Sequence, residues 1–247
     1  MFSFFQKKNY LVDYLHGLVD VHNHILPGID DGAKTVEESI GLIKEFGQFG
    51  IKNFICTPHI MHHHYENTPK TISGAHRTLV SALEKTTLSE VFVGYAAEHM
   101  IDENFENILE KGQVVGLKDS FLLIEMSYLQ PSLNFDIAVE KMAKLKYFPV
   151  LAHPERYMYF HQKYKIYPKM RANGIQFQLN LLSLTAESYG GGVQKIAVKL
   201  LEDQLVDFVG SDIHNMRQLN LLKEIKLQNK TLNLLLPVIE NTIETFY

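Results

Sequence analysis

The sequence predicts an α/β fold, a barrel built from β/α units, and two observations indicate it. Seven short apolar runs, rich in Val, Ile, Phe and Leu, alternate with amphipathic segments along the 247 residues. Each run is apolar almost throughout, as expected of a strand that is covered on both faces in a parallel sheet. Seven such strands separated by helices favour a barrel, although the strand count alone does not exclude an open, doubly wound sheet.

The elements follow one another in a regular order. The predicted strands cover residues 18–21, 53–56, 91–95, 121–124, 148–151, 175–179 and 206–209. After the first strand, Thr35-Val-Glu-Glu38 fits a capping box, and apolar residues then recur at helical spacing until Gly50 ends the helix. Similar periodicity predicts helices over residues 136–146, 193–202 and 219–226.

A single domain, residues 1–247, accounts for the whole sequence, because no low-complexity segment or Pro/Gly-rich linker divides it. Residues 1–16 are expected to form a lead-in segment. Residues 231–247 show helical spacing that Pro237 interrupts, and we expect a terminal helix that packs on the barrel.

Composition and charge narrow the class of protein. The charges sum to 24 − 28 = −4, so there is no general basic field of the kind that binds nucleic acid. The single cysteine, Cys56, cannot form an intrachain disulfide, which fits a reducing compartment. No apolar stretch approaches the roughly 18 residues of a membrane span. We expect a cytoplasmic enzyme without membrane insertion; the alternative is weak contact of Phe2, Phe4 and Phe5 with a membrane or a partner.

Groups that can bind a divalent metal follow six of the seven predicted strands. Barrel enzymes build their sites at the C-terminal ends of the strands, so these groups would meet on one rim. In chain order they are His22 and His24, then His59, Glu98, Glu125 and His153, and last Asp212 and His214. The remaining strand ends on Asn180. Asp31, in the loop after His24, is a further carboxylate beside the same rim.

The spacing within two of these segments suits shared ligation. Residues i and i+2 of an extended strand point the same way, so His22 and His24 can bind one ion together. Imidazole and carboxylate groups suit Zn, Mn or Fe, and no cysteine is placed to select a softer metal. A His-x-His pair alone is more often structural or incidental. The joint placement of all six segments is what predicts a metal centre.

Several neighbouring residues allow two interpretations. The run His62-His-His64 cannot place all its side chains on one ion from a regular element, so we expect a loop role, with substrate contact as the alternative. Tyr128, Tyr157 and Tyr159 lie just beyond ligand-bearing strand ends. Their rings either stack on an aromatic substrate or pack inside the protein.

Four motifs of the sequence resemble the PHP (polymerase and histidinol phosphatase) superfamily. They are Val19-Asp-Val-His-Asn-His-Ile-Leu-Pro-Gly-Ile-Asp-Asp-Gly32, Cys56-Thr-Pro-His59, Leu151-Ala-His-Pro-Glu-Arg156 and Gly210-Ser-Asp-Ile-His-Asn215. Within the superfamily the chain is most similar to bacterial manganese-dependent protein-tyrosine phosphatases of capsule and exopolysaccharide operons. The first motif is the specific one, because a bare His-x-His is shared with many amidohydrolases. His99 and the segment after Glu125 depart from the family pattern without removing a ligand.

The resemblance implies a distorted (β/α)7, TIM-like barrel of the PHP type that holds three metal ions. The resemblance implies that these ions are Mn2+, and the ligand chemistry leaves Zn2+ or Fe open as alternatives. Arg156 matches a phosphate-binding arginine, and Arg217 matches a second one less closely. The implied ligands are His22, His24, Glu98 and Asp212 for the first ion, Glu98, Glu125 and His153 for the second, and Asp31, His59 and His214 for the third.

The implied reaction is hydrolysis of phosphotyrosine by a metal-activated hydroxide, without a phosphoenzyme intermediate. Metal binding lowers the pKa of a water from 15.7 to about 7, and Arg156 supplies a planar donor fork for phosphate. His59 and Asp212 are candidates for proton transfer, between which the sequence does not choose. A cysteine-based phosphatase needs an arginine six residues after its cysteine; His62 stands there after Cys56, which excludes that mechanism.

The resemblance also implies a partner, a phosphotyrosine protein that is a bacterial tyrosine kinase regulating capsular or exopolysaccharide synthesis. Two alternatives stay open. One is a small-molecule phosphatase of the same superfamily, such as a histidinol phosphatase. The other is a catalytically weak module that docks on the kinase.

Overall fold

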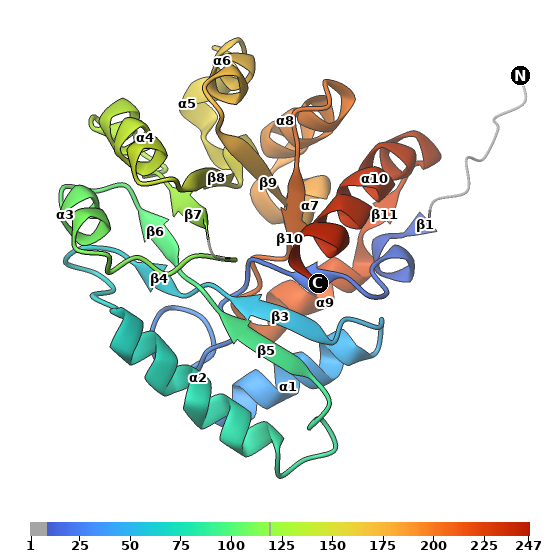
Figure 1. The fold of residues 1–247 in the computed structure, drawn as a ribbon. Helices are drawn as coiled ribbons and strands as arrows, with labels where there is room; N and C mark the ends of the chain where they lie inside the picture. Colours follow the sequence, from blue (N-terminus) through green and yellow to red (C-terminus); the bar gives the residue numbers. More distant parts are fainter. Residues whose placement is uncertain (1–8, 119) are drawn as a thin grey trace, which may run out of the picture.

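The computed structural model describes residues 9–118 and 120–247, which form an α/β fold around a curled parallel sheet (Figure 1). The expectation for Phe2, Phe4 and Phe5 lies outside the described residues. The strands are β1 (Asn9–Tyr10), β2 (Val19–Asp20), β3 (Asn53–Cys56), β4 (His59–Ile60), β5 (Phe92–Tyr95), β6 (Glu98–Met100), β7 (Phe121–Glu125), β8 (Phe148–Ala152), β9 (Gln176–Asn180), β10 (Phe208–Gly210) and β11 (Lys226–Leu227). All seven predicted strands are present within two residues of the predicted bounds.

Two parallel sheets carry the candidate ligands. Six strands pair in the order β10-β9-β8-β7-β6-β4, and three pair in the order β2-β3-β5. The chain passes from β3 into β4 through Thr57 and Pro58, and from β5 into β6 through two alanines. An isolated parallel bridge between Asn23 and Ile213 joins the segments that follow β2 and β10. The C-terminal strand ends therefore meet at one end of the molecule.

Helices surround these sheets (Figure 1). The helices α1 and α2 cover the three-stranded sheet, whereas α3, α4, α5, α6 and α8 lie outside the six-stranded sheet. Their bounds are α1 Val36–Gly47, α2 Pro69–Leu83, α3 Phe105–Glu110, α4 Phe135–Lys144, α5 Met158–His161, α6 Ile166–Ala172, α7 Ala186–Tyr189, α8 Gly191–Glu202, α9 Met216–Glu224 and α10 Asn229–Phe246. Three 3-10 helices are η1 Leu11–Tyr14, η2 Pro154–Arg156 and η3 Leu181–Leu184.

Only one of the two hydrogen bonds of the predicted capping box of α1 forms. The Thr35 hydroxyl oxygen accepts from the Glu38 backbone N–H at 3.2 Å, as the motif predicts. The Glu38 carboxylate was expected to accept from the Thr35 N–H, but it accepts from the Lys34 N–H instead, at 2.7 Å. The Glu38 carboxylate therefore satisfies a backbone N–H one residue before the one that the motif implies.

The continuous apolar character of the strands has a direct structural reason. On β7, Leu122 and Ile124 pack outward against the helices, whereas Leu123 points to an inner cluster with Val150. All of these side chains are buried. Because both faces of the strand are covered, no position can be polar without a buried partner. Period-two alternation is consequently missing from the sequence.

The terminal helix α10 covers the end of the sheet opposite the candidate ligands. Its Phe246 ring lies 4.9 Å from the Phe208 ring and 5.7 Å from the Phe121 ring, centroid to centroid. Phe208 and Phe121 are the first residues of β10 and β7. Pro237 lies inside this helix without ending it. Across the described residues, no helix combines the length and apolar character that crossing a membrane requires.

The segment before β2 packs on the fold from Asn9 onward. Tyr10 of β1 pairs with Lys226 of β11 in an antiparallel two-stranded sheet, and Leu11 and Leu15 are fully buried. The predicted helix over residues 219–226 therefore ends earlier, at Glu224, because Lys226 takes an extended conformation to pair with β1.

Candidate metal centre

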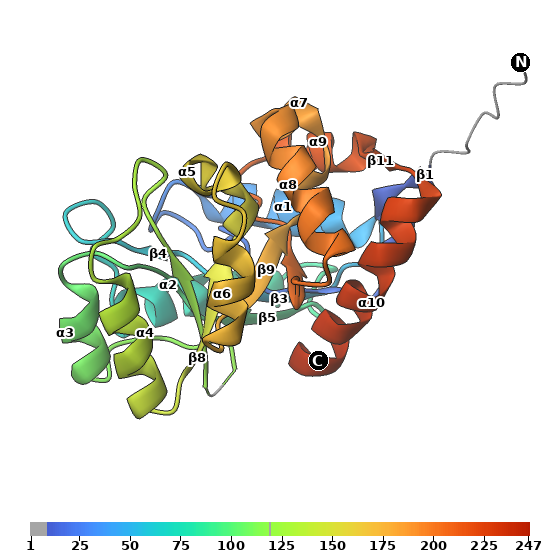
Figure 2. The same cartoon turned by 90° about the horizontal axis from the view of Figure 1, so that it is seen from above.

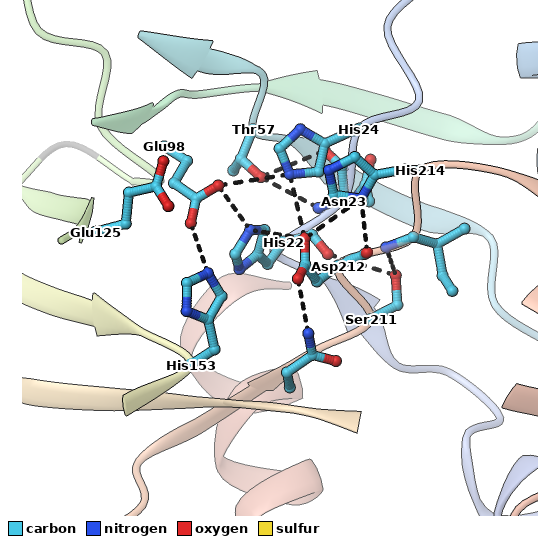
Figure 3. Close-up of polar contacts among 12 residues, drawn as sticks. His22, Asn23, His24, Thr57, Glu98, Glu125, His153, Ser211, Asp212 and His214 are labelled. Carbon is cyan, nitrogen blue, oxygen red and sulfur yellow. Dashed lines mark hydrogen bonds and ion pairs between the residues drawn. The ribbon is translucent and has the colours of Figure 1, made fainter. Parts of the chain in front are cut away.

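The backbone brings nine sequence-predicted ligands to one end of the curled sheet, and Figure 3 shows most of them converging. Each stands on, or a few residues after, the C-terminal end of a parallel strand, apart from the loop residue Asp31. They are His22 and His24 after β2, His59 opening β4, Glu98 opening β6, Glu125 closing β7, His153 after β8, and Asp212 and His214 after β10. Two of them, His153 and Asp212, have left-handed backbone φ angles of 36° and 54°. Such strain in non-glycine residues is concentrated at functional sites.

The ligand atoms lie close together, and apart from a hydrogen bond of 3.0 Å between His153 Nε2 and Glu98 Oε1 several of them face one another without a hydrogen-bond partner in the described part of the chain. His22 Nε2 lies 3.2 Å from Glu98 Oε2 and 3.4 Å from Asp212 Oδ1. His24 Nε2 lies 3.5 Å and 3.3 Å from the same two oxygens. Among the described residues these two imidazole nitrogens and Glu98 Oε2 have no hydrogen-bond partner, although they are fully buried. Buried polar atoms that face each other in this way fit a cation placed between them.

Four overlapping groups of these residues could each hold an ion, with their ligand atoms within 4.8 Å of one another. One difference from the expected sets concerns Glu125, which groups with His59 and Glu98 rather than with His153: Glu125 Oε1 lies 3.0 Å from His59 Nδ1. The groups are His24, Asp31, His59 and His214; His22, His24 and Asp212; His22, Glu98 and His153; and His59, Glu98 and Glu125.

The electrostatics of the centre keep two of its carboxylates, those of Glu98 and Asp212, ionised. Burial raises the pKa of Glu98, but the His22 and His59 imidazoles outweigh burial and hold that pKa well below its usual range. Burial likewise raises the pKa of Asp212, and the surrounding imidazoles and Arg156 again outweigh it, leaving the pKa well below its ordinary value. Ionised carboxylates beside imidazoles are the form that binds divalent transition metals.

A second layer of residues orients the ligands, and the sequence pattern gave little sign of it. The buried Asp30 carboxylate contacts His24 Nδ1 at 2.8 Å, and Gln178 Oε1 contacts His22 Nδ1 at 2.7 Å. Asn180, the one strand end without a ligand, donates from Nδ2 to Asp212 Oδ2 at 2.7 Å. Partners on the far nitrogen fix the tautomer of a metal-binding histidine.

The loop that carries Asp30 and Asp31 folds back closely over His24. Gly32 N donates to Asp30 Oδ1 at 2.9 Å, and a Cβ atom on Gly32 would lie 2.0 Å from the His24 carbonyl oxygen. The backbone can approach this closely only at glycine. The final glycine of the first motif therefore has a structural role beside the ligands.

Arg156 contacts a proposed ligand at the edge of the centre, whereas Arg217 contacts none and only shares a surface pocket with His214. Arg156 Nη1 donates to Asp212 Oδ2 at 2.6 Å, and its guanidinium lies 4.6 Å and 4.2 Å from the ring centroids of Tyr128 and Tyr189. This stacking between two rings holds the cation in place. Arg217 on α9 is exposed and forms no ion pair with any residue that the structure describes.

The structure separates the residues that allowed two interpretations. Tyr157 is fully buried and its hydroxyl accepts from Met126 N, so it packs inside the protein. Tyr128 is 41% exposed, and its hydroxyl lies 3.3 Å from His153 Nε2 at the open side of the centre. The rings of His62 and His63 do come together, with centroids 3.8 Å apart, and His63 has a left-handed φ of 64°. They lie in a separate group with Glu66.

Two other buried groups near the centre are structural. His99 is fully buried, burial lowers its pKa to about 4, and its ring nitrogens contact the Leu123 carbonyl and the Val115 N–H. Burial also raises the pKa of the Cys56 thiol, which removes the thiolate that a cysteine nucleophile needs.

Comparisons with known proteins agree with this geometry. Residues 18–230 match the family model described as capsular polysaccharide synthesis, CpsB/CapC. The tyrosine-protein phosphatase YwqE of Bacillus subtilis (strain 168) is 30% identical over 209 residues, covering 82% of this chain and 80% of that protein. The tyrosine-protein phosphatase CpsB of Streptococcus pneumoniae is 28% identical over 204 residues, covering 81% and 84%.

A solved structure extends the likeness to the whole fold. It comes from work on YwqE of Bacillus subtilis and CpsB of Streptococcus pneumoniae, described as metal-dependent tyrosine phosphatases. The match has a TM-score of 0.81 and 28% sequence identity, and it covers 93% of this chain and 94% of that one. This chain therefore belongs to the CpsB/CapC family of capsular polysaccharide synthesis.

Proposed function

We propose that this protein is a metal-dependent protein-tyrosine phosphatase, which hydrolyses phosphotyrosine in a phosphorylated protein. The observation that carries the proposal is the convergence of nine imidazole and carboxylate ligands beside a guanidinium. The family and its relatives named tyrosine-protein phosphatases support the substrate. We further infer a distorted (β/α)7 barrel, in which the two parallel sheets and the Asn23–Ile213 bridge make one ring.

Three Mn2+ ions are the proposed metal content, with Zn2+ or Fe able to take the same ligands. The unpartnered buried atoms of His22, His24 and Glu98 support the first position. Ions bound there would lower the pKa of a water and neutralise charge on the phosphoryl oxygens. The ligand sets proposed from the family resemblance are His22, His24, Glu98 and Asp212 for the first ion; Glu98, Glu125 and His153 for the second; Asp31, His59 and His214 for the third. In the structure Glu125 lies with His59 and Glu98 instead, so binding of the second ion would require Glu125 to turn toward His153.

Arg156 is proposed to bind the phosphoryl group. One of its nitrogens is held by Asp212, which leaves the other donors of the planar fork for phosphate oxygens. Stacking between Tyr128 and Tyr189 fixes the plane of the fork before substrate arrives. Arg217 could serve as a second phosphate contact only if its exposed side chain turned toward the centre.

The leaving group needs modest help. A phenolate has a pKa near 10, so it departs more easily than an alkoxide. Of the two candidates for proton transfer, Asp212 Oδ2 already accepts from Arg156 and Asn180. His59 is engaged as well, because its Nδ1 faces Glu98 and Glu125 and its Nε2 faces Asp31. These contacts therefore favour neither residue for this role.

A bacterial tyrosine kinase that regulates capsular or exopolysaccharide synthesis is the proposed phosphoprotein partner, and the cytoplasm the proposed location. Membership of a capsular polysaccharide synthesis family supports the partner. No observation favours histidinol phosphate as the substrate instead.

The test is turnover by the purified protein together with elemental analysis of its metals. We expect bound divalent metal, higher kcat/KM for phosphotyrosine peptides than for histidinol phosphate, and loss of turnover with chelator. Cys56→Ser should keep activity, whereas His22→Ala should lose it. Activity that survives the chelator but is lost in Cys56→Ser would overturn the proposal. A higher kcat/KM for histidinol phosphate would mean that the substrate is a small phosphate ester rather than phosphotyrosine.

A further inference from the structure

A groove with a volume of about 910 Å³ opens beside the metal centre. Three segments line it, and each begins within four residues of a proposed ligand: 61–64 after His59, 100–103 after Glu98, and 129–134 after Glu125. In Figure 2 the loop between β4 and α2 and the loop between β7 and α4 lie on the same side of the molecule. A volume near the upper end of ordinary ligand pockets, about 300–1,000 Å³, exceeds what one phosphotyrosine side chain requires.

One wall of the groove is strongly apolar for a surface. Leu129 is 91% exposed and Leu133 is 97% exposed, and Pro131 stands between them. Single exposed leucines are normal, but two nearly bare leucines on one short loop of a groove indicate a surface that a partner covers.

A second part of the groove's lining, next to the apolar loop, is acidic. Asp102, Glu103 and Glu106 line it, and no lysine or arginine is among the described lining residues. Lys141 neutralises Glu106 at 2.7 Å from outside the groove. The Glu103 carboxylate is 71% exposed, and among the described residues its one ion-pair partner is His63, whose Nε2 lies 3.8 Å away. Glu103 is therefore the carboxylate most available to a positive side chain.

The two neighbouring surfaces therefore have opposite preferences. The metal centre with Arg156 suits a phosphate, whereas the groove suits a cation next to an apolar side chain. We propose that the groove binds the polypeptide flanking the phosphotyrosine and selects a flank that carries Lys or Arg beside an apolar residue. This inference rests on the proposed function and adds the sequence preference of its substrate.

The experiment compares kcat/KM for two synthetic phosphotyrosine peptides, one with Lys and Leu in the flanks and one with Glu and Ser. A small aryl phosphate, p-nitrophenyl phosphate, reports on the metal centre alone. The Lys/Leu peptide should be the better substrate. Glu103→Lys should lower its kcat/KM about fivefold, the scale of an exposed charge pair, and raise that of the Glu/Ser peptide. Leu133→Ser should lower kcat/KM for the Lys/Leu peptide without changing the turnover of p-nitrophenyl phosphate.

Two matched variants serve as controls. Glu90→Lys makes the same charge change and Leu145→Ser the same apolar loss, both on exposed residues away from the groove; neither should alter the peptide ratio. Equal kcat/KM for the two peptides would overturn the proposed role of the groove. So would an equal effect of Glu103→Lys on the turnover of the peptides and of p-nitrophenyl phosphate. Either result would leave the proposed phosphatase activity intact. Loss of metal-dependent turnover for all three substrates would refute the proposed function and the groove together.

Discussion

The Asp30 carboxylate links three parts of the site through one side chain. It contacts His24 Nδ1, accepts from Gly32 N, and accepts from His59 N at 3.2 Å. Burial raises its pKa, but His24 outweighs burial, so the net shift is downward and the group stays ionised. An ionised partner on Nδ1 leaves His24 Nε2 free to bind a metal.

Asp30→Ala should accordingly weaken metal binding about tenfold to hundredfold, the usual scale for loss of such an orienting partner. Titration of chelator-treated protein with Mn2+ measures this affinity. Asp13→Ala removes an exposed carboxylate far from the centre and provides the control. Unchanged affinity in the Asp30 variant would show that the loop, rather than this contact, orients His24.

Arg156→Lys should lower kcat/KM for phosphotyrosine about a hundredfold while leaving the melting temperature near that of the unmodified chain. Lysine keeps the charge but loses both the planar fork and the stacking between Tyr128 and Tyr189. Arg217→Lys should have little effect, because that side chain is exposed and no described ligand contacts it, although it lines the same surface pocket as His214. A comparable loss in the Arg217 variant would mean that this arginine reaches the phosphate when substrate binds.

Ligand positions were predictable from the sequence, whereas the residues that orient them were not. His22 and His214 each follow an apolar run, so strand ends locate them. Nothing local distinguishes Asp30, which orients a ligand, from Asp31, which stands among the ligands, because the two are adjacent and chemically identical. Gln178 lies inside a strand, where only the register with its neighbours shows that it faces His22.

At the level of elements, long apolar strands could be read from the sequence, but β4 and β6 could not. His59-Ile60 and Glu98-His-Met100 are short and largely polar, so they carry no strand pattern. They pair because β3 and β5 deliver them side by side, with His59 opposite Glu98 in register. Tertiary geometry therefore determines these strands, and it also places two proposed ligands next to each other.

The helix α10 offers a test that separates folding from function. Phe246→Ala removes a buried ring from the cluster at the N-terminal ends of β7 and β10 and should cost about 3–5 kcal/mol. The melting temperature should fall by roughly 10 °C. Turnover per folded molecule at low temperature should not change, since the proposed ligands lie at the other end of the strands.

Tyr247→Ala, at an 83% exposed position beside Phe246, provides the matched control and should leave the melting temperature unchanged. A Phe246 variant that is stable but inactive would show that α10 communicates with the site.

On the scale of the whole molecule, the proposed ligands come from both parallel sheets and so connect parts of the chain that are far apart. Glu98 stands in the six-stranded sheet and His22 follows the three-stranded one, yet their side chains lie 3.2 Å apart. The buried carboxylates of Glu98 and Asp212 face the imidazoles of both His22 and His24 across this junction. Cations that bind here would therefore stabilise the closed arrangement of the two sheets.

Removal of metal should thus lower stability as well as activity. A ligand that binds only the folded state contributes about 2.7 kcal/mol when present at a hundred times its dissociation constant. We expect chelator to abolish aryl phosphate turnover and to lower the melting temperature, and added Mn2+ to restore both. In His22→Ala the chelator should shift the melting temperature less, because one proposed ligand of the first ion is missing. If chelator stops turnover but leaves the melting temperature unchanged, the ions take part in catalysis without holding the two sheets together.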